Sequence, residues 1–254
     1  MNILPAKMVE SLSLIRTFVT FPSSHLGSPN YGLVSFLQQN RGSRVSFPKT
    51  TWSLEKCCMR VENCLQALRP ASEAFAQEAT DALKAGKVIA VPTDTLYGLA
   101  CDACSSEAVH RIYEIKGRKL TSPLAICVGD VSDITRFAVT DHLPSGLLDS
   151  LLPGPVTVVL KRGILQVRSE TALALTSANL SGQPSSVCVN DFENLWQHCA
   201  YVYDGGVLPA GRAGSTIIDL TERGTYKILR AGSAKEQTVA ILERYSLLEE
   251  AASI

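Results

Sequence analysis

The chain has 254 residues, of which 46% are hydrophobic, and its 24 Lys and Arg balance its 24 Asp and Glu. This length is enough for one large domain with a substantial core, and the zero net charge excludes nucleic-acid binding through an overall basic field. The longest apolar run is much shorter than the ~20 residues that span a bilayer, so no transmembrane segment is predicted.

The first sixty residues differ in composition from the rest. They contain seven Lys or Arg against two Glu, together with many serines. This composition is typical of a mitochondrial transit segment, and a disordered leader is the alternative. We therefore expect a leader over 1–66, a folded domain over 67–248 and a tail over 249–254, in a protein located in the cytoplasm, in mitochondria or in both.

Eight cysteines at irregular spacing do not indicate a disulfide framework. Cys101 and Cys104 have the spacing of a zinc or redox pair, but no second Cys or His pair accompanies them. Small buried side chains are the favoured interpretation, and no metal site is predicted.

Regular elements begin near Ser72, where apolar residues recur at helical spacing until Gly86. Residues 88–91 are consecutive β-compatible residues, which predicts a buried strand that ends at Pro92. A second helix begins at Ser105 or Ser106 and ends at Gly117. Further strands are predicted over 124–128, 156–160, 172–175, 215–219 and 226–230, and amphipathic helices over 190–199 and 235–247.

Polar side chains follow the first predicted strand. Thr93, Asp94, Thr95 and Tyr97 come directly after Pro92, at the point where open α/β sheets place their ligands. An ordinary polar turn is the alternative interpretation of these residues.

A second polar segment contains Lys116, Arg118 and Lys119 with the hydroxyls of Thr121 and Ser122. The dipole of the preceding helix accounts for about one of these cations, so the others favour an anion such as phosphate. A solvated basic loop is the alternative. The same pattern recurs at Thr157, at Thr176 to Asn179, at Ser215 and at Arg230, each at one end of a predicted strand.

Several common catalytic motifs do not occur in the sequence. It has no P-loop and no Rossmann glycine fingerprint, and its four His are scattered outside the polar segments. Cations and hydroxyls without an evident base fit phosphoryl or nucleotidyl chemistry. The residues alone therefore predict a nucleotide or phosphate ligand and go no further.

An ordered series of segments resembles the successive motifs of the YrdC family, over about residues 70 to 245. They are Pro92–Leu99, Lys116–Arg118, Ser122–Leu124, Pro153–Thr157, Thr176–Gly182, Ser215–Asp219 and Leu229–Gly232. The resemblance implies an α/β fold: a single YrdC-like domain in which helices flank a twisted, mixed parallel and antiparallel sheet with a concave ligand-binding face.

The resemblance also implies an activity, that of a threonylcarbamoyl-AMP synthase. Such an enzyme converts L-threonine, bicarbonate and ATP, with Mg2+, to threonylcarbamoyl adenylate and pyrophosphate. A separate transferase complex then uses the adenylate to modify adenosine 37 of ANN-decoding tRNAs, and weak contact with RNA is a further implied partner interaction.

Roles for individual residues follow from the same resemblance. Lys116 and Arg118 would be catalytic and would contact ATP. The other implied ATP-binding residues are Ser122, Thr157, Ser177, Asn179 and Arg230. The implied threonine-binding residues are Thr95, Arg168 and Ser215.

The segment 161–175 departs from the family pattern. The family usually has a longer segment there, with a strand of the type Val-Gly-Val-Arg-x-Pro and a helix, and here only Val167 and Arg168 match that strand. Loss of an internal helix would expose core residues at a cost of several kcal/mol. Two alternatives to the enzyme therefore stay open: a double-stranded RNA or tRNA-binding module, and an inactive isoform.

Overall fold

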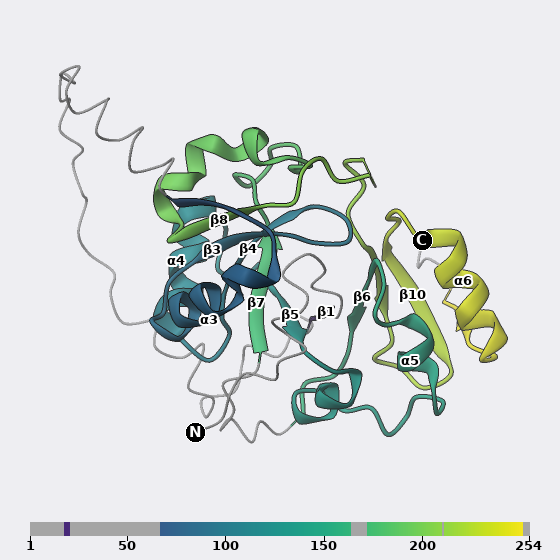
Figure 1. Ribbon diagram of the computed structural model, residues 1–254. Helices are drawn as coiled ribbons and strands as arrows, with labels where there is room; N and C mark the ends of the chain where they lie inside the picture. Colours follow the sequence, from purple (N-terminus) through teal and green to yellow (C-terminus); the bar gives the residue numbers. More distant parts are fainter. Residues whose placement is uncertain (1–17, 21–66, 164–171, 210, 251–254) are drawn as a thin grey trace, which may run out of the picture.

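The computed structural model of the protein describes residues 18–20, 67–163, 172–209 and 211–250 (Figure 1). Its strands form a mixed 11-stranded sheet in the order β11-β10-β9-β6-β1-β5-β7-β4-β3-β8-β2. The strands are β1 (Phe18–Thr20), β2 (Leu68–Pro70), β3 (Ile89–Pro92), β4 (Tyr97–Asp102), β5 (Ala125–Val128), β6 (Val156–Val159), β7 (Ala172–Ser177), β8 (Tyr201–Asp204), β9 (Thr216–Asp219), β10 (Thr225–Arg230) and β11 (Leu248–Glu249). The α-helices are α3 (Ala76–Lys84), α4 (Ser106–Lys116), α5 (Leu147–Leu151) and α6 (Lys235–Arg244), and the 3-10 helices are η3 (Glu73–Phe75), η4 (Val131–Arg136) and η5 (Val189–His198).

The strand predicted before Pro92 is present as β3, but it continues into a hairpin. β3 pairs antiparallel with β4, and Pro92 lies opposite Tyr97. Sequence reasoning placed Tyr97 in a ligand-binding junction and did not predict β4. The hairpin turns the polar residues 93–96 back at the end of the sheet, so they form a short loop between two buried strands.

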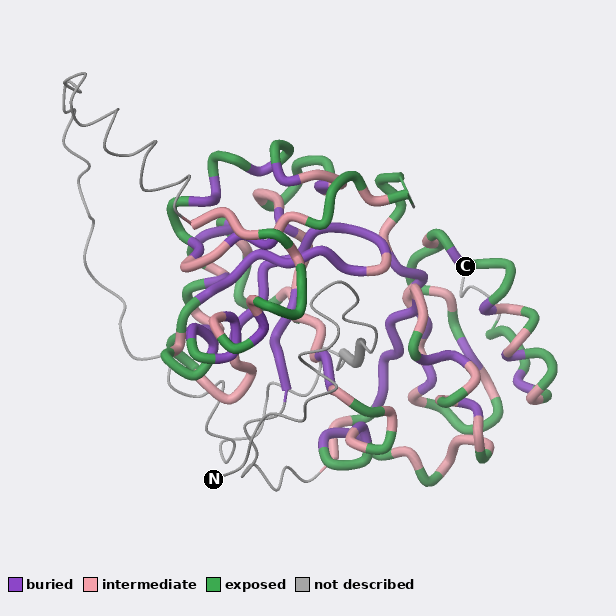
Figure 2. The backbone as a smooth tube through the Cα atoms, viewed as in Figure 1, coloured by how far each residue is buried: buried purple, intermediate pink, exposed green. Residues whose placement is uncertain are grey.

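Helices cover both faces of the β3–β4–β7–β8 part of the sheet. Ala90, Tyr97 and Leu99 belong to the core that contains α4 and η5. Ile89 and Val91, which point to the opposite face, pack with α3. Alternate strand residues therefore enter two different cores, and Figure 2 shows the central strands as a buried region between exposed helix surfaces.

The other part of the sheet contains β6, β9 and β10 and has its own core. Val158 and Ile218 pack with Leu147 and Leu151 of α5 and with Leu242 of α6. Figure 1 shows α5 and α6 together beside β10. β6 and β9 run parallel, which brings their first residues to the same end of the sheet.

β1 lies between these two parts of the sheet. It pairs antiparallel with β5 and parallel with β6. Sequence reasoning assigned Phe18–Thr20 to a leader. The structure instead pairs these three residues with the sheet. At the other end of the chain, β11 pairs with β10, and Thr225 Oγ1 donates a hydrogen bond to Glu250 Oε1 at 2.8 Å.

The predicted helix boundaries have clear physical causes. Ser105 caps α4, because its hydroxyl accepts the Ala108 N–H at 3.2 Å, and Gly117 ends α4 with a left-handed φ of 56°. The helix predicted over 190–199 is instead the 3-10 helix η5, kinked at Phe192. Over the described ranges, no helix has the length and apolar character needed to span a membrane.

Candidate active site

The loop of the β3–β4 hairpin carries Thr95. Thr93 closes this loop: its hydroxyl donates to Leu96 O at 2.7 Å and accepts the backbone N–H groups of Thr95 and Leu96 at 3.2 and 3.1 Å. Thr95 is 4% exposed, and its Oγ1 lies 3.4 Å from Thr93 Oγ1. The loop thus holds a hydroxyl in a fixed position, as recognition of a small polar ligand requires.

Lys116 is the last residue of α4, and its side chain is 2% exposed. Its ammonium donates to the backbone carbonyls of Ser177 and, at 2.6 Å, of Asn179. Burial, followed by the nearby charge of Arg118, lowers the pKa of Lys116 to about 8. The ammonium therefore ties the end of α4 to the residues that follow β7, and it would have to leave these carbonyls to reach a phosphate.

Arg118 lies in the loop after α4 and is anchored to that loop. Its Nη2 donates to Pro123 O at 2.9 Å, and its Nε lies 3.4 Å from Ser122 O. Tyr113 also donates to Ser122 O, at 2.8 Å. Within the described part of the chain these bonds engage two N–H groups of the guanidinium, so the others remain for an anion.

Asn179 follows β7, and its side-chain amide is oriented by three contacts. Nδ2 donates to Leu180 O and Gln183 O, both at 2.8 Å, and Oδ1 lies 3.5 Å from Lys116 Nζ. Ser177 ends β7 opposite Gly98 of β4. We call Lys116, Arg118, Ser122, Ser177 and Asn179 the α4–β7 group.

Thr157, Ser215 and Arg230 form a second group, which we call the β6–β9 group. The Thr157 and Ser215 hydroxyls are 2.7 Å apart, and both residues are buried. Arg230 donates from Nε and Nη2 to Ser215 O at 3.1 and 2.8 Å, and its Nη2 lies 3.2 Å from Ser215 Oγ. Burial lowers the pKa of the Arg230 guanidinium, as expected for a cation partly removed from water.

The β3–β4 hairpin adjoins both groups. A Cβ atom on Gly214 would lie 3.1 Å from Leu96 Cδ1 and 3.0 Å from Arg230 Nη2, so the loop packs beside the β6–β9 group. The α4–β7 group joins the same hairpin through the Ala178 N–H, which donates to Tyr97 O at 2.7 Å. The hairpin therefore adjoins the β6–β9 group through Leu96 of its loop and the α4–β7 group through Tyr97 of β4. Arg168, the remaining predicted site residue, lies outside the described residues.

Sequence reasoning placed Tyr97 among the ligand-binding residues, and the structure shows a different use of its side chain. Tyr97 is fully buried; its hydroxyl donates to Gly206 O at 2.7 Å and accepts the Gly205 N–H at 2.9 Å. Burial raises its pKa to about 12. The alternation of Tyr97, Leu99 and Cys101 on one face was a signal that Tyr97 belongs to the core.

The thiol of Cys101 has the environment of a structural cysteine. It is fully buried, and burial raises its pKa to about 12, so little reactive thiolate forms near neutral pH. This confirms the interpretation of Cys101 as a small buried side chain. Across the described ranges, no three His, Cys, Asp or Glu side chains come together as a candidate metal site.

Comparison with protein-family models gives one match. The Sua5/YciO/YrdC model, described as "Telomere recombination", matches residues 81–171 and 164–232. Among curated proteins, threonylcarbamoyl-AMP synthase of Bos taurus is 44% identical over 196 residues, which are 65% of this chain and 71% of that protein. Threonylcarbamoyl-AMP synthase of Homo sapiens is 45% identical over 202 residues, 67% of this chain and 72% of the human protein.

Comparison with solved structures also finds a Sua5 protein. P. abyssi Sua5 in complex with L-threonine aligns with a TM-score of 0.57 and 26% identity, over 72% of this chain and 61% of the Sua5 chain. The chain thus spans about three fifths of that Sua5 protein. A mixed α/β fold, ordered motifs, a matching family model and relatives more than 40% identical agree, and the chain belongs to the Sua5/YciO/YrdC family.

Proposed function

We propose that this chain is a threonylcarbamoyl-AMP synthase, which makes threonylcarbamoyl adenylate and pyrophosphate from L-threonine, bicarbonate and ATP. The observation that supports the proposal is that the hairpin carrying Thr95 adjoins two polar groups, one rich in hydroxyls and one built around Lys116 and Arg118. The mammalian relatives bear the name of this enzyme, and the P. abyssi Sua5 structure holds L-threonine.

The chemistry fits groups that position substrates and stabilise charge. The neutral threonine amine and bicarbonate give a carbamate and water, and a carbamate oxygen then attacks the α-phosphorus of ATP while pyrophosphate leaves. Negative charge then develops on the phosphates, where Arg118 offers a planar fork and Lys116 a buried positive charge. Neither step requires a nucleophile from the protein, in accord with the lack of a catalytic His or Ser motif.

We assign the threonine side of the site to Thr95 and Ser215, because both hydroxyls are buried and their loops touch through Leu96 and Gly214. Arg168 is also proposed to bind threonine. The proposed ATP-binding residues are Lys116, Arg118, Ser122, Thr157, Ser177, Asn179 and Arg230. Thr157 and Arg230 bond Ser215 directly, so they would connect the nucleotide and threonine sides.

Mg2+ would enter with ATP in this proposal. The proposed ATP ligands are hydroxyls, an amide and cations, whereas Mg2+ in proteins prefers carboxylates, water and substrate phosphates. The residues present thus suit an ATP whose phosphates carry the metal ion. The adenylate would pass to a separate tRNA-modifying complex, and we propose the cytoplasm, mitochondria or both as locations.

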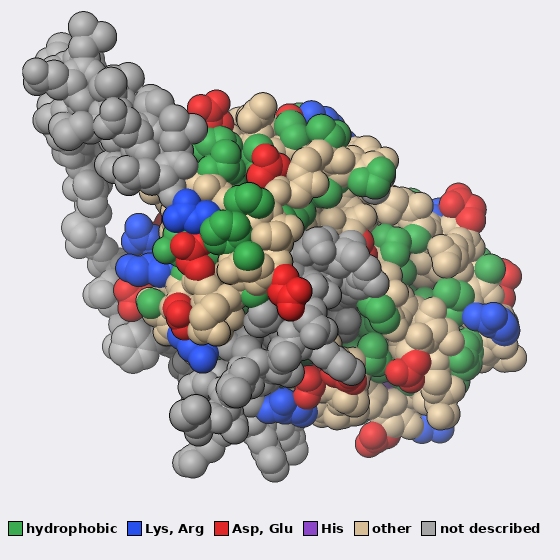
Figure 3. Space-filling view, viewed as in Figure 1, with side chains coloured by type: hydrophobic (Ala, Val, Ile, Leu, Met, Phe, Trp, Pro, Cys, Tyr) green, Lys and Arg blue, Asp and Glu red, His purple; other side chains and the backbone are tan. Residues whose placement is uncertain are grey.

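An RNA-binding module is the alternative that the surface charges can address. On the face drawn in Figure 3, described Lys and Arg side chains are interspersed with Asp and Glu. Strong RNA binding draws on clustered cations that release counterions. The described side chains on this face therefore do not form an extended cluster of cations.

The test is pyrophosphate release by the purified full chain, with each substrate omitted in turn. We expect release only when threonine, bicarbonate and ATP are all present, and we expect Arg118→Ala to abolish it. A matched control is Arg136→Ala, which removes a surface cation of η4 paired with Asp133 at 3.1 Å. Release of pyrophosphate without threonine, or full turnover by Arg118→Ala, would contradict the proposal.

A further inference from the structure

The segment Ser185–Cys188, which we call the junction segment, connects several parts of the candidate site. Its residue Ser186 accepts the Tyr97 N–H at 2.9 Å and donates its hydroxyl to Ala178 O at 2.6 Å. Val187 O accepts the Leu208 N–H at 2.9 Å. The junction segment thus bonds the start of β4, the residue between Ser177 and Asn179, and the chain that leads from β8 to β9.

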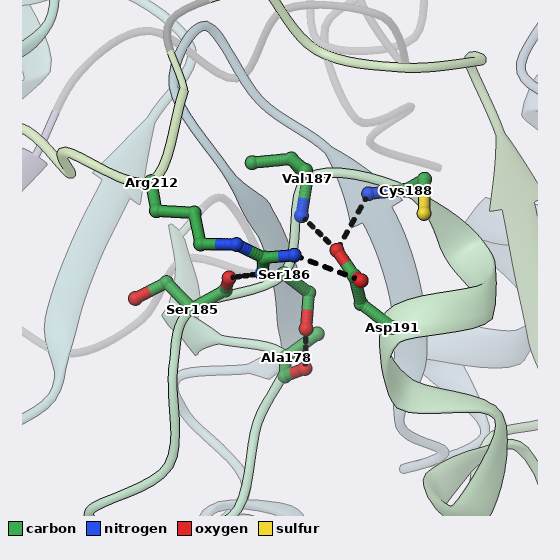
Figure 4. Close-up of polar contacts among 7 residues, drawn as sticks. All are labelled: Ala178, Ser185, Ser186, Val187, Cys188, Asp191 and Arg212. Carbon is green, nitrogen blue, oxygen red and sulfur yellow. Dashed lines mark hydrogen bonds and ion pairs between the residues drawn. The ribbon is translucent and has the colours of Figure 1, made fainter.

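Arg212 joins this segment from the β8–β9 connection, three residues before Ser215. Its guanidinium donates to Ser185 O and, at 3.1 Å, to Asp191 Oδ1 of η5 (Figure 4). The other carboxylate oxygen of Asp191 accepts the backbone N–H groups of Val187 at 2.8 Å and Cys188 at 3.3 Å. Arg212 and Asp191 therefore hold the junction segment between them.

The β8–β9 connection is held at its start by the Tyr97 hydroxyl, which bonds Gly205 and Gly206, and Leu208 packs against the core that contains α4 and η5. Val207 is 76% exposed, and a Cβ atom on Gly206 or Gly211 would meet nothing within 4 Å among the described residues. Leu208 supplies the backbone bond to Val187. Beyond Leu208, among the described residues, Arg212 supplies the side-chain bonds that hold the later part of this connection to the junction segment and to η5.

We propose that Arg212 and Asp191 are positioning residues of the reaction, which set the spacing between the threonine-side residue Ser215 and the nucleotide-side residues Ser177 and Asn179. This inference rests on the proposed function. Thr157 and Arg230 bond Ser215, and Lys116 bonds the carbonyls of Ser177 and Asn179. The Arg212–Asp191 pair holds the connection that leads to Ser215 against the junction segment, which bonds Ala178 between Ser177 and Asn179, and neither residue is among the proposed substrate ligands.

The charge of the pair persists over the working range of pH. The hydrogen bond from Arg212, followed by the Val187 N–H, lowers the pKa of Asp191 to about 2. Asp191 is therefore ionised wherever the protein would be assayed. A variant that removes the charge, Asp191→Asn, changes the link without introducing a new titration.

The first measurement is amide hydrogen exchange of residues 205–216 in the full chain, which does not depend on activity. We expect Arg212→Met and Asp191→Asn each to speed exchange there by about fivefold or more, in keeping with the loss of one exposed ion pair. The double variant should speed exchange by less than the two single effects combined, because both changes remove the shared Arg212–Asp191 bond. Unchanged exchange in the single variants would overturn the inference.

The second measurement is steady-state turnover. Misalignment of two bound substrates lowers kcat more than it weakens binding of either one, so we expect kcat to fall about tenfold while the KM for ATP changes less than about twofold. Arg212→Lys keeps the charge and loses the fork that reaches Ser185, and should recover part of kcat. Wild-type kcat in Arg212→Met would overturn the inference.

The control is Lys161→Met, which breaks the exposed Lys161–Glu222 pair of 2.9 Å at the opposite end of β6 and β9. It should leave both exchange and kcat unchanged. The inference would also fail if the Lys161 control and the variants of the Arg212–Asp191 pair lost kcat equally, in step with a lower melting temperature. If the wild-type chain makes no adenylate, the proposed function fails. The exchange rates still decide whether the Arg212–Asp191 pair holds the β8–β9 connection in place.

Discussion

The hydroxyls of Thr157, the second residue of β6, and Ser215, which directly precedes β9, lie 2.7 Å apart and join the beginnings of these two parallel strands. Arg230 completes this arrangement by donating two hydrogen bonds to Ser215 O. The backbone and the side chain of Ser215 are thus both fixed before any ligand binds. Fixed hydroxyls of this kind are a form of preorganisation, which lowers the entropy that binding must oppose.

Ser215→Ala should weaken threonine binding more than Thr157→Val does. Ser215 is the proposed threonine contact, and loss of one hydrogen bond to a charged or polar substrate corresponds to about tenfold in affinity. Thr157→Val leaves the Ser215 hydroxyl within 3.2 Å of Arg230 Nη2, so the affinity should change less. Titration calorimetry with threonine checks the order of the two effects, and equal affinities in wild type and Ser215→Ala would refute the assignment.

The affinity for ATP should fall at alkaline pH, because Lys116 loses its charge there. Its pKa is lowered to about 8 by burial and by Arg118, so it loses its charge as pH rises through about 8. We expect the affinity for ATP to fall between pH 7 and 9, measured by calorimetry in the absence of threonine. Lys116→Arg keeps its charge over this range, and its affinity should stay flat. A wild-type affinity that does not change with pH would contradict the role of the ammonium.

The lowered pKa of Lys116 also makes the stability of the protein depend on pH. The folded-state pKa of Lys116 lies below its ordinary value of 10.5, so between about pH 8 and 10.5 the unfolded chain binds the extra proton. The contribution of Lys116 to the free energy of unfolding therefore rises with pH in this window and is least favourable below it. Urea denaturation of wild type and Lys116→Met at pH 7 and 9.5 would measure the difference.

Gly232→Ala should destabilise the fold and abolish turnover. A Cβ atom there would lie 2.3 Å from Ser215 C and from Thr216 N, both backbone atoms that cannot move aside. We expect a loss of at least about 3 kcal/mol, at the upper end of overpacking effects. Gly224→Ala is the control: its φ is +75° but nothing lies within 4 Å, so strain of about 1–2 kcal/mol is expected. Chemical denaturation of the two variants should separate them, and similar stabilities would show that the backbone contact is wrong.

Val19→Pro should weaken the sheet, because Val19 pairs with Ile126 of β5 on one side and Val158 of β6 on the other. Proline cannot donate to a strand ladder, so we expect a loss of about 1–3 kcal/mol in the free energy of unfolding. Val19→Thr retains the N–H and serves as the control in the same urea titration. Equal stability of the two variants would show that β1 does not hold this position. Removal of residues 1–20 would remove β1 and leave unpaired the edges of β5 and β6 between which β1 lies.

Local signals made part of this fold predictable. Ser105 and Gly117 mark the ends of α4 because capping and the left-handed end are decided by residues close in sequence. β4 was missed, although Tyr97 to Cys101 alternate correctly, because its identity as a strand depends on pairing with β7, some 75 residues later. Short pieces such as β1 and β11 have no local signal at all.

The candidate site, like the fold, was predictable only where the sequence carries a local signal. The ordered motifs predict Thr95, Arg118, Asn179 and Ser215 as site residues through their resemblance to the family's motifs. The sequence could not show that the Lys116 ammonium bonds backbone carbonyls beyond β7, because that contact joins residues 61 and 63 positions apart. Arg212 and Asp191 were not singled out for the same reason: an exposed Arg and Asp carry no signal until η5 and the β8–β9 connection meet.

The most direct test of the enzymatic account is the fate of the bicarbonate carbon. The full chain is incubated with ATP, L-threonine and 13C-bicarbonate, and the nucleotide products are examined by mass spectrometry. The account predicts a product with the mass of AMP joined to threonine and one carboxyl carbon, shifted by the 13C label. Formation of AMP or ADP without a labelled threonine adduct would contradict it.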